Sequence, residues 1–189
     1  MTTEVKQSPR ERLLEAAATL TYRDGVCIGV EALCKAAGVS KRSMYQLFES
    51  KDALLAASLE RRTSVYVAAL LPAADDNRSP RQRILHVFEQ VEAQAAGPEF
   101  HGCPFLAAQI ELKDQSHPAS QVARAVKENL TGFFRAEAER GGASDPSLLA
   151  RQLSLVFDGG SARAGIGADK LTDLIAPTVT TLLDAAGVR

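Results

Sequence analysis

The sequence of 189 residues predicts an all-α fold of nine helices, and three observations support this prediction. The apolar residues are mostly Ala, Leu and Val, and Ala and Leu lose little conformational freedom on entering a helix. Long segments lack both Gly and Pro. Nearly every such segment repeats its apolar residues at helical rather than alternating spacing, and none of convincing length predicts a strand.

The first helix has the clearest start signal of the chain. Ser8 can cap the helix, Pro9 suits the first helical position, and Glu11 completes a capping box. Gly25 ends the helix. The same start chemistry recurs at residues 79–82, directly after the clearest linker-like stretch of the chain.

The remaining Gly, Pro and capping signals divide the chain further. The predicted helices cover residues 9–24, about 30–36, about 41–47, 51–71, 80–96, about 103–112, 118–140, from 146 onward, and about 170–186. We expect one domain over residues 8–55, including the start of a connecting fourth helix, and a second helical domain over residues 56–189.

The second and third helices fit a helix-turn-helix. Two short helices that cross steeply need apolar residues where they touch, and Cys34 is small enough to allow a close approach. Gly38 stands at the turn, where a positive φ is expected. The residues expected at the contact are Leu33, Ala37, Val39, Met44 and Leu47.

The third helix has an outward face suited to DNA. At about 100° per residue, Met44, Leu47 and Phe48 point toward the core, and the opposite face is polar. Arg can pair with guanine and Gln with adenine, while Lys and Tyr can hold phosphates. The helix start normally faces base edges, which favours Arg42 and Ser43 as readers. The predicted DNA-binding residues are Ser40, Lys41, Arg42, Ser43, Tyr45, Gln46 and Lys51.

Three strings in this region, at residues 36–41, 44–48 and 50–55, resemble the signature of the tetracycline-repressor (TetR) family. The resemblance covers about residues 10–60. It implies a nine-helix fold with an N-terminal three-helix DNA-binding domain and a C-terminal domain for effector binding and dimerisation. It also implies that Tyr45 and Lys51 contact phosphates. The string at residues 102–106, GCPFL, followed by Glu111-Leu112, resembles a C-terminal motif of one TetR subgroup.

Four positions depart from the pattern that the resemblance implies. Ser43 stands where the family usually has Thr, and Arg42 where Gly is common. Leu47 stands where Tyr or His is frequent, which predicts one phosphate contact fewer. Gly29 stands where a capping Thr is common, so that hydroxyl contact is lost. We therefore expect Arg42 to carry an unusual share of recognition.

The resemblance implies two roles for the C-terminal domain. The first is homodimerisation through the eighth and ninth helices, which lets two readers bind a palindrome. Apolar residues at helical spacing there could form either the dimer interface or the intramolecular core. They are Leu149, Leu153, Val156, Phe157 and Gly160 on one helix, and Leu171, Leu174, Ile175, Val179, Leu182 and Leu183 on the other. The small residues 159–162 would allow close approach between helices.

The second role is the binding of a small apolar or amphipathic effector among the fifth to eighth helices. Such pockets are mostly apolar, with a few polar anchors. Ordinary core packing is the alternative for each candidate. The candidates are His86, Phe88, Cys103, Phe105, Gln109, Phe134 and Phe157.

Charge gives modest support to a DNA-binding N-terminus. Residues 1–65 carry ten Lys or Arg and eight Asp or Glu, a net charge of +2. The rest of the chain carries twelve and fifteen, a net charge of −3. The sign suits a segment that binds phosphates, although a difference of this size carries little weight alone.

Other classes of function fit the sequence poorly. Residues 159–163 begin like a nucleophile elbow, but Arg163 replaces the final Gly and no strand precedes it. Residues 165–167 start a dinucleotide fingerprint, but Lys170 stands where the third Gly belongs. The His and Cys residues have no metal-ligand spacing. We expect no enzyme activity, cofactor or metal. The alternative is a helical ligand-binding or protein-partner module with a vestigial reading helix.

Three further features indicate where in the cell the protein is expected. No apolar run is long enough to cross a membrane. Residues 1–8 are polar and lack the apolar core of a signal peptide. The three cysteines are odd in number and unpatterned, as in a reducing compartment. We expect a cytoplasmic protein whose partners are double-stranded DNA, a second copy of itself and an unknown effector, with no membrane partner.

Overall fold

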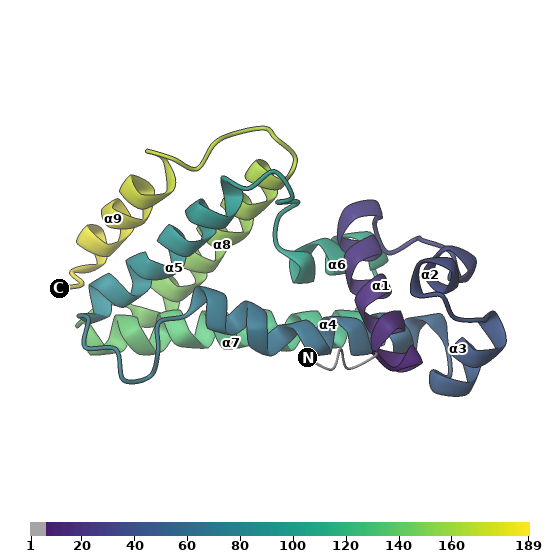
Figure 1. The fold of residues 1–189 in the computed structure, drawn as a ribbon. Helices are drawn as coiled ribbons and strands as arrows, with labels where there is room; N and C mark the ends of the chain where they lie inside the picture. The colour runs from purple at the N-terminus through teal and green to yellow at the C-terminus, as the bar shows by residue number, and fades with distance from the viewer. Residues whose placement is uncertain (1–6) are drawn as a thin grey trace, which may run out of the picture. The chain divides into compact units, whose positions relative to one another are not determined.

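A computed structural model of the chain describes residues 7–189 (Figure 1). Most of the segment considered for a signal peptide, residues 1–6, lies outside the described residues. The described part contains nine helices and no strand, which confirms the predicted fold class. The helices are α1 Pro9–Asp24, α2 Val30–Ala37, α3 Lys41–Leu47, α4 Lys51–Leu70, α5 Pro80–Ala95, α6 Pro104–Leu112, α7 Pro118–Arg140, α8 Pro146–Gly165 and α9 Ile175–Ala186.

Both predicted capping boxes form. The Ser8 hydroxyl accepts a hydrogen bond from the Glu11 N–H, and the Glu11 carboxylate accepts one from the Ser8 N–H at 2.8 Å. The Ser8 hydrogen bonds also lower the pKa of Glu11 below its usual value. Ser79 and Gln82 form the equivalent pair at the start of α5. These bonds satisfy backbone donors that the first turn of a helix leaves without partners.

The predicted start of the ninth helix at Lys170 is wrong, because α9 begins at Ile175. Pro177 explains the difference. Inside a helix it would remove a backbone hydrogen bond and clash with the carbonyl four residues earlier. A start at Ile175 places Pro177 in the first turn, where its missing N–H costs nothing. Just before the helix, Asp173 adopts a positive φ of 59°, which is incompatible with helix.

The chain forms two compact units. The first holds the described residues up to Thr63 together with Ala107–Arg124, and the second holds Ser64–Leu106 and Ala125–Arg189. In the first unit, α1 packs against α2 and α3. The buried core of this unit consists of Leu13, Leu14, Ala17, Leu33, Cys34, Ala37, Met44, Phe48 and Leu54.

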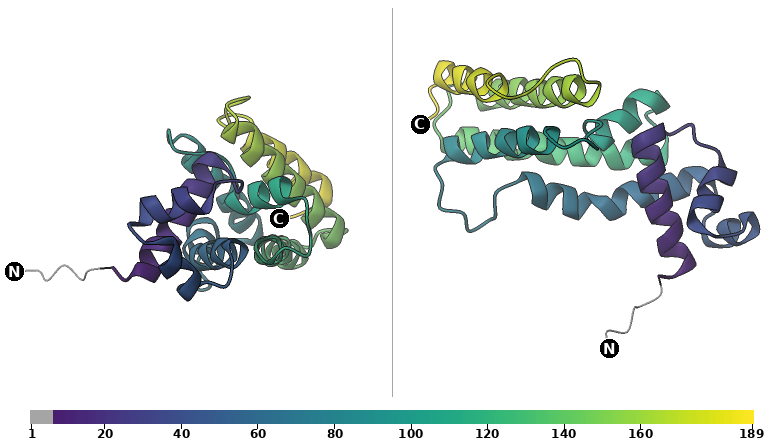
Figure 2. Two further views of the ribbon diagram at one scale, coloured as in Figure 1. Left: turned by 90° about the vertical axis from the view of Figure 1, so that its right-hand side faces the viewer. Right: turned by 45° about the horizontal axis from the view of Figure 1, so that its top comes forward.

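In the second unit, α8 and α9 run side by side and α5 packs against both (Figures 1 and 2). Gly160 allows this approach, since a Cβ there would lie 2.9 Å from Ile175 Cδ1. The centre is aromatic. The Phe88 ring stacks on Phe134 at 5.5 Å between centroids and meets Phe157 edge-on at 6.4 Å.

A buried ion pair ties α5 to α7 in the second unit. Arg83 Nε donates to Glu137 Oε1 at 2.9 Å, and both side chains are less than a tenth exposed. Arg83 also donates to the carbonyl oxygens of Ala73 and Asp76 in the preceding loop. Arg140 supplies Glu137 with a second cation at 2.8 Å. The buried charges are thus paired and hydrogen-bonded, as burial requires.

In the part of the chain that the structure describes, no helix is both long and apolar enough to span a membrane.

Candidate DNA interface

The turn between α2 and α3 forms as the sequence predicts. Gly38 adopts the left-handed conformation, with φ 61° and ψ 39°. Its N–H donates to the carbonyls of Cys34 and Lys35, and the Val39 N–H donates to Cys34 at 3.0 Å. These bonds close the last turn of α2, and the chain then reverses into α3.

Ser40 caps α3 and holds Ser43. The Ser43 N–H donates to Ser40 Oγ at 3.0 Å, and the two hydroxyl oxygens lie 2.9 Å apart. Both residues therefore stand at the start of α3, the end that normally meets base edges. Gly29 caps α2 without any side-chain hydrogen bond.

The outward face of α3 carries the four predicted polar residues. Lys41, Arg42, Tyr45 and Gln46 are all exposed, and Tyr45 is 49% exposed despite its size. Met44 lies between them in sequence but is fully buried. The first turn of α3 contains no acidic residue, so nothing on it opposes an approaching phosphate.

The prediction that Leu47 points to the core is wrong, because this side chain is 39% exposed. The core side of α3 is filled by Met44 and Phe48, both buried, while Leu33 and Ala37 fill the facing side of α2. A short helix has room for few buried positions. Leu47 lies about 60° beyond Met44 around the helix axis, far enough to leave the contact.

Lys51 stands at the first position of α4, where Ser50 caps the helix by accepting the Ala53 N–H at 3.0 Å. Its ammonium group donates to the Val26 carbonyl at 2.7 Å. An ammonium has three N–H bonds, so two remain for other acceptors. The adjacent helix start also attracts anions.

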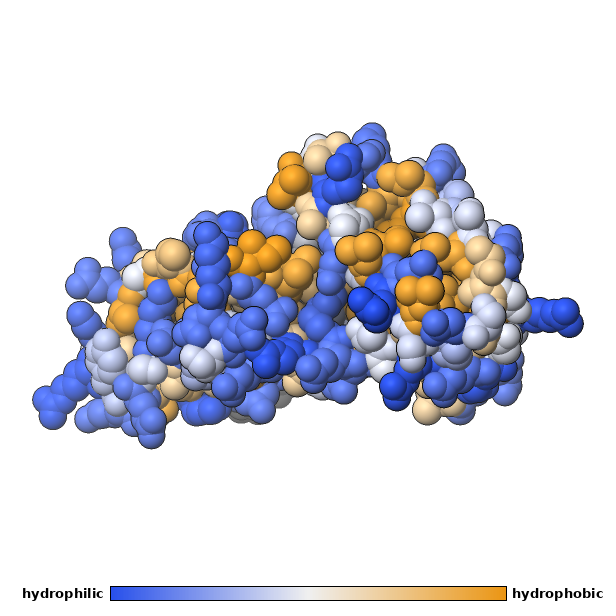
Figure 3. Space-filling model, turned by 180° about the vertical axis from the view of Figure 1, so that it is seen from behind, coloured by the Kyte–Doolittle hydropathy of each residue, from blue (hydrophilic) through white to orange (hydrophobic). Residues whose placement is uncertain are grey.

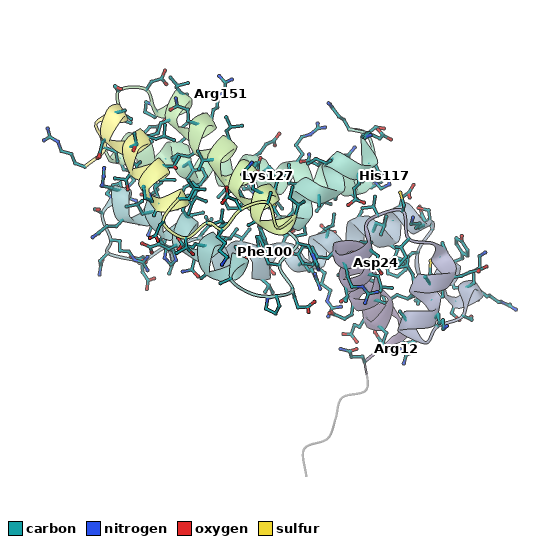
Figure 4. The ribbon with its side chains drawn as sticks, turned by 90° about the horizontal axis from the view of Figure 1, so that it is seen from above. Arg12, Asp24, Phe100, His117, Lys127 and Arg151 are labelled. Atoms are coloured by element: carbon teal, nitrogen blue, oxygen red, sulfur yellow. The ribbon has the colours of Figure 1, made fainter. Side chains whose placement is uncertain are left out.

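Two contacts that hold the helix-turn-helix (α2, the turn and α3) and the loop before it in place were not predicted. Arg12 on α1 (labelled in Figure 4) donates to the carbonyls of Ala37 and Gly38, at 3.0 and 3.4 Å. Glu111 on α6 accepts the Val26 N–H at 2.7 Å. Because the partners are 25 and 85 residues apart, no local pattern could have indicated either contact.

Cys34 lies in the core of the first unit, 6% exposed. Burial raises the pKa of its thiol above the usual value, because a thiolate would lose its hydration there. The residue therefore acts as a small apolar side chain that lets α3 approach α2.

A small, mostly apolar cavity of about 20 Å³ lies in the second unit. Its wall contains two of the predicted effector-binding residues, Cys103 and Phe157. Cys103 Sγ accepts a hydrogen bond from Tyr66 Oη at 3.1 Å. Lys127 (labelled in Figure 4) lies in the wall too, 4.5 Å from the centroid of the Phe157 ring, and its ammonium bonds to Asp158. No sequence pattern beyond ordinary helical spacing indicated Tyr66 or Lys127.

The other predicted effector-binding residues lie elsewhere. Phe88 and Phe134 form the core beside Phe157, and Phe105 packs against Tyr66 at 5.0 Å between ring centroids. Gln109 lines a separate, open cavity in the first unit.

His86 lies near Glu89 on its own helix, with Nδ1 3.9 Å from the carboxylate. Burial, followed by the charge of Arg78, lowers the pKa of His86. The structure thus gathers part of the predicted set at one cavity and leaves His86 and Gln109 away from it.

A helical unit with a glycine turn, a capped second helix and a polar outward face defines a helix-turn-helix protein. The family model described as "Bacterial regulatory proteins, tetR family" matches residues 13–58. The chain is 76% identical to a crystal structure described as a TetR-type transcriptional regulator from Streptomyces avermitilis MA-4680. That match covers 97% of this chain and 100% of the other, with a TM-score of 0.95. The chain belongs to the TetR family.

Two further relatives support the fold and the N-terminal match. SCO4454 from Streptomyces coelicolor, a TetR-family transcriptional regulator, has the same fold at 24% identity and a TM-score of 0.79, over 95% of this chain and 96% of that one. The HTH-type transcriptional regulator Rv1255c from Mycobacterium tuberculosis is 36% identical over 76 residues, which is 40% of this chain. The match spans only 38% of that curated relative's length.

Proposed function

We propose that this protein is a cytoplasmic regulator of transcription that binds a palindromic DNA operator as a homodimer and acts as a repressor, not as an enzyme. The outward face of α3 is the observation that carries the proposal. It presents four polar side chains to solvent around one buried methionine, with no acidic residue in its first turn. Family membership supports the same conclusion.

The proposed roles divide along the reading helix. Arg42 and Gln46 read base edges in the major groove, because their side chains offer bidentate hydrogen bonds. Lys41, Tyr45 and Lys51 contact phosphates and set the register. Ser40 and Ser43 stand at the helix start and add hydroxyl contacts. The proposed DNA-binding domain comprises residues 8–55, and the effector-binding and dimerisation domain residues 56–189.

Dimerisation through α8 and α9 is supported by residues that the core of the second unit leaves exposed. Most residues singled out by their spacing, among them Leu149, Leu153 and Phe157, are buried inside the chain, whereas Leu174 is exposed. Another stripe, on α8 and the residue directly after it, faces outward: Leu148, Leu155, Gly159, the half-buried Ala162 and Ile166. The large residues among these are 48–79% exposed. At 100° per residue they fall on one face, an apolar surface suited to a second copy.

The outward face of α9 matches this surface. Leu174 is 44% exposed, and Thr178, Thr181 and Ala185 continue the same face without a charge. Figure 3, which looks at the side of the second unit that carries α8 and α9, shows apolar side chains gathered there. Uncharged, small and apolar residues are what a helix-to-helix interface between two copies needs.

Effector binding is proposed at the cavity beside Cys103. Ligand pockets for small molecules typically have volumes of about 300–1,000 Å³, so a cavity of about 20 Å³ must open to admit one. Its lining is apolar apart from a few groups, among them Lys127, Tyr66 and Asn129. An apolar effector with one or two polar groups fits this lining. An effector that prefers the opened state would shift the protein away from its DNA-binding form.

The test is the salt dependence of DNA binding. We expect the purified protein to bind random duplex DNA with an affinity that falls by about three orders of magnitude or more between 50 and 200 mM salt. Lys41→Ala should lower the slope by about one unit for each reader. Lys170→Ala, which changes an exposed lysine of the second unit, is the matched control and should leave the slope unchanged. A flat response would overturn the proposal in favour of a ligand-binding module with a vestigial reading helix.

A further inference from the structure

Two hydrogen bonds on one residue connect α6 to the start of α4 within the first unit. Glu111 Oε2 on α6 accepts the N–H of Val26 at 2.7 Å. The carbonyl of Val26 in turn accepts from Lys51 Nζ at 2.7 Å. Val26 is buried, so its two backbone groups need these partners. The Lys51 ammonium is therefore positioned by the carbonyl of Val26, and the N–H of Val26 is in turn bound by Glu111.

Gly25 makes the carboxylate contact possible. It adopts a φ of +88°, a conformation that side chains disfavour, and a Cβ there would lie 2.6 Å from Glu111 Oε2. The loop between α1 and α2 thus approaches Glu111 as closely as a backbone can. A hydrogen bond to a carboxylate is about twice as strong as a neutral one, so this contact fixes the loop firmly.

A second residue of the segment after α6, His117, lies close to the start of α4. His117 Nδ1, just before α7, accepts the Ala119 N–H at 3.1 Å. Nε2 lies 3.3 Å from the carboxylate of Asp52, the residue after Lys51. Residues 107–124 thus supply the hydrogen bond to Val26, through Glu111, and place His117 beside Asp52.

We propose that Glu111 is a positioning residue for DNA binding. By holding the Val26 peptide, it orients the Lys51 ammonium so that the two remaining N–H bonds face a DNA phosphate. The inference rests on the proposed function, because Lys51 matters for affinity only if the protein binds DNA. It assigns a role in the reader to a residue that lies outside the helix-turn-helix, 85 residues from its partner in sequence.

The test compares full-length variants by their affinity for random duplex DNA over a range of salt concentrations. Lys51→Ala should weaken binding on the order of tenfold and lower the salt slope by about one unit for each reader. Glu111→Ala should reproduce both effects although it removes no cation. Glu111→Gln keeps an oxygen that can accept the Val26 N–H, so it should restore the affinity and slope of the parent protein. Glu128→Ala, an exposed carboxylate of α7, serves as the control.

The double variant separates a positioning role from a general loss of stability. If Glu111 acts through Lys51, Glu111→Ala combined with Lys51→Ala should bind DNA no more weakly than Lys51→Ala alone. Additive losses would overturn the inference, and so would an unchanged affinity of Glu111→Ala. Failure of the parent protein to bind any duplex would instead overturn the proposed function, and the role of Lys51 with it.

Discussion

At the scale of single residues, the side chains of α3 are of two kinds. Some can form hydrogen bonds that identify a base, and others can only contact the DNA backbone. Arg42 stands at the second position of α3, exposed and with no acidic neighbour in that turn. Leu47, at the far end, is exposed but cannot donate to a phosphate. We therefore expect α3 to make fewer polar contacts with DNA than the family pattern implies, and Arg42 to contribute a larger share of them.

Arg42→Ala should lower affinity for the selected operator by about 1–3 kcal/mol and relax specificity at one base position in each half-site. The physical reason is that a guanidinium can make two hydrogen bonds to one guanine, and no other base offers the same acceptors. Selection of bound sequences from a random DNA pool, with the parent and the variant in parallel, measures both effects. Tyr45→Phe should weaken binding to all sequences alike. A variant that selects the same sequences as the parent would contradict the reading role of Arg42.

At the scale of elements, polar contacts as well as the apolar core fix the order of helices in the second unit. Arg83 on α5 reaches Glu137 on α7 and the carbonyls of the loop after α4. A buried pair of this kind need not add much net stability, but removing one partner leaves a buried charge alone. The pair thus makes the position of α5 against α7 sensitive to single substitutions.

Glu137→Ala should destabilise the protein by about 3–5 kcal/mol, because it leaves Arg83 buried without its carboxylate. Chemical denaturation of the purified variant measures the change in the free energy of unfolding. Glu139→Ala provides the control, since this carboxylate lies on the same helix, is 59% exposed, and pairs only loosely with Arg135. It should cost less than about 1 kcal/mol. Equal losses for the two variants would show that the buried pair has no special role.

At the scale of the whole molecule, the proposed function requires two DNA-reading helices in one assembly. A single reading helix contacts too few base pairs for useful specificity, whereas two can bind both halves of a palindrome. The outward stripe of α8 and the uncharged face of α9 are the surfaces that we propose for that assembly. Arg151, labelled on the outer side of α8 in Figure 4, flanks the stripe as a polar rim would.

Leu155→Glu should convert the dimer to a monomer, because a buried carboxylate at an apolar interface has no partner to offset its desolvation. Leu155 is 74% exposed in the single chain, so the monomer should fold normally. Sedimentation or light scattering gives the oligomeric state, and circular dichroism checks the helix content. Val65→Glu is the matched control, an exposed apolar residue of α4 outside the stripe. A dimeric Leu155→Glu variant would exclude this surface as the interface.

The sequence by itself determined the features that depend on local chemistry. Each of these features involves only a few neighbouring residues, so it can be recognised in the sequence. They are the capping boxes at Ser8 and Ser79, the positive φ of Gly38 and the helical repeat of apolar residues. The α3 reader could be predicted for the same reason. The resemblance to the TetR family, also carried by local strings, is confirmed at the level of the family.

Only the tertiary structure decided what each apolar face packs against. Periodicity identified stripes on α8 and α9 but could not distinguish intramolecular core from a free surface, and most residues of these stripes, though not Leu174, proved to be core. It also placed Leu47 inside, although Met44 and Phe48 already fill the buried side of α3. Contacts such as Glu111 to Val26 join residues far apart in sequence, so they exist only once the chain has folded. Local signals thus set the helices, and long-range packing set their partners.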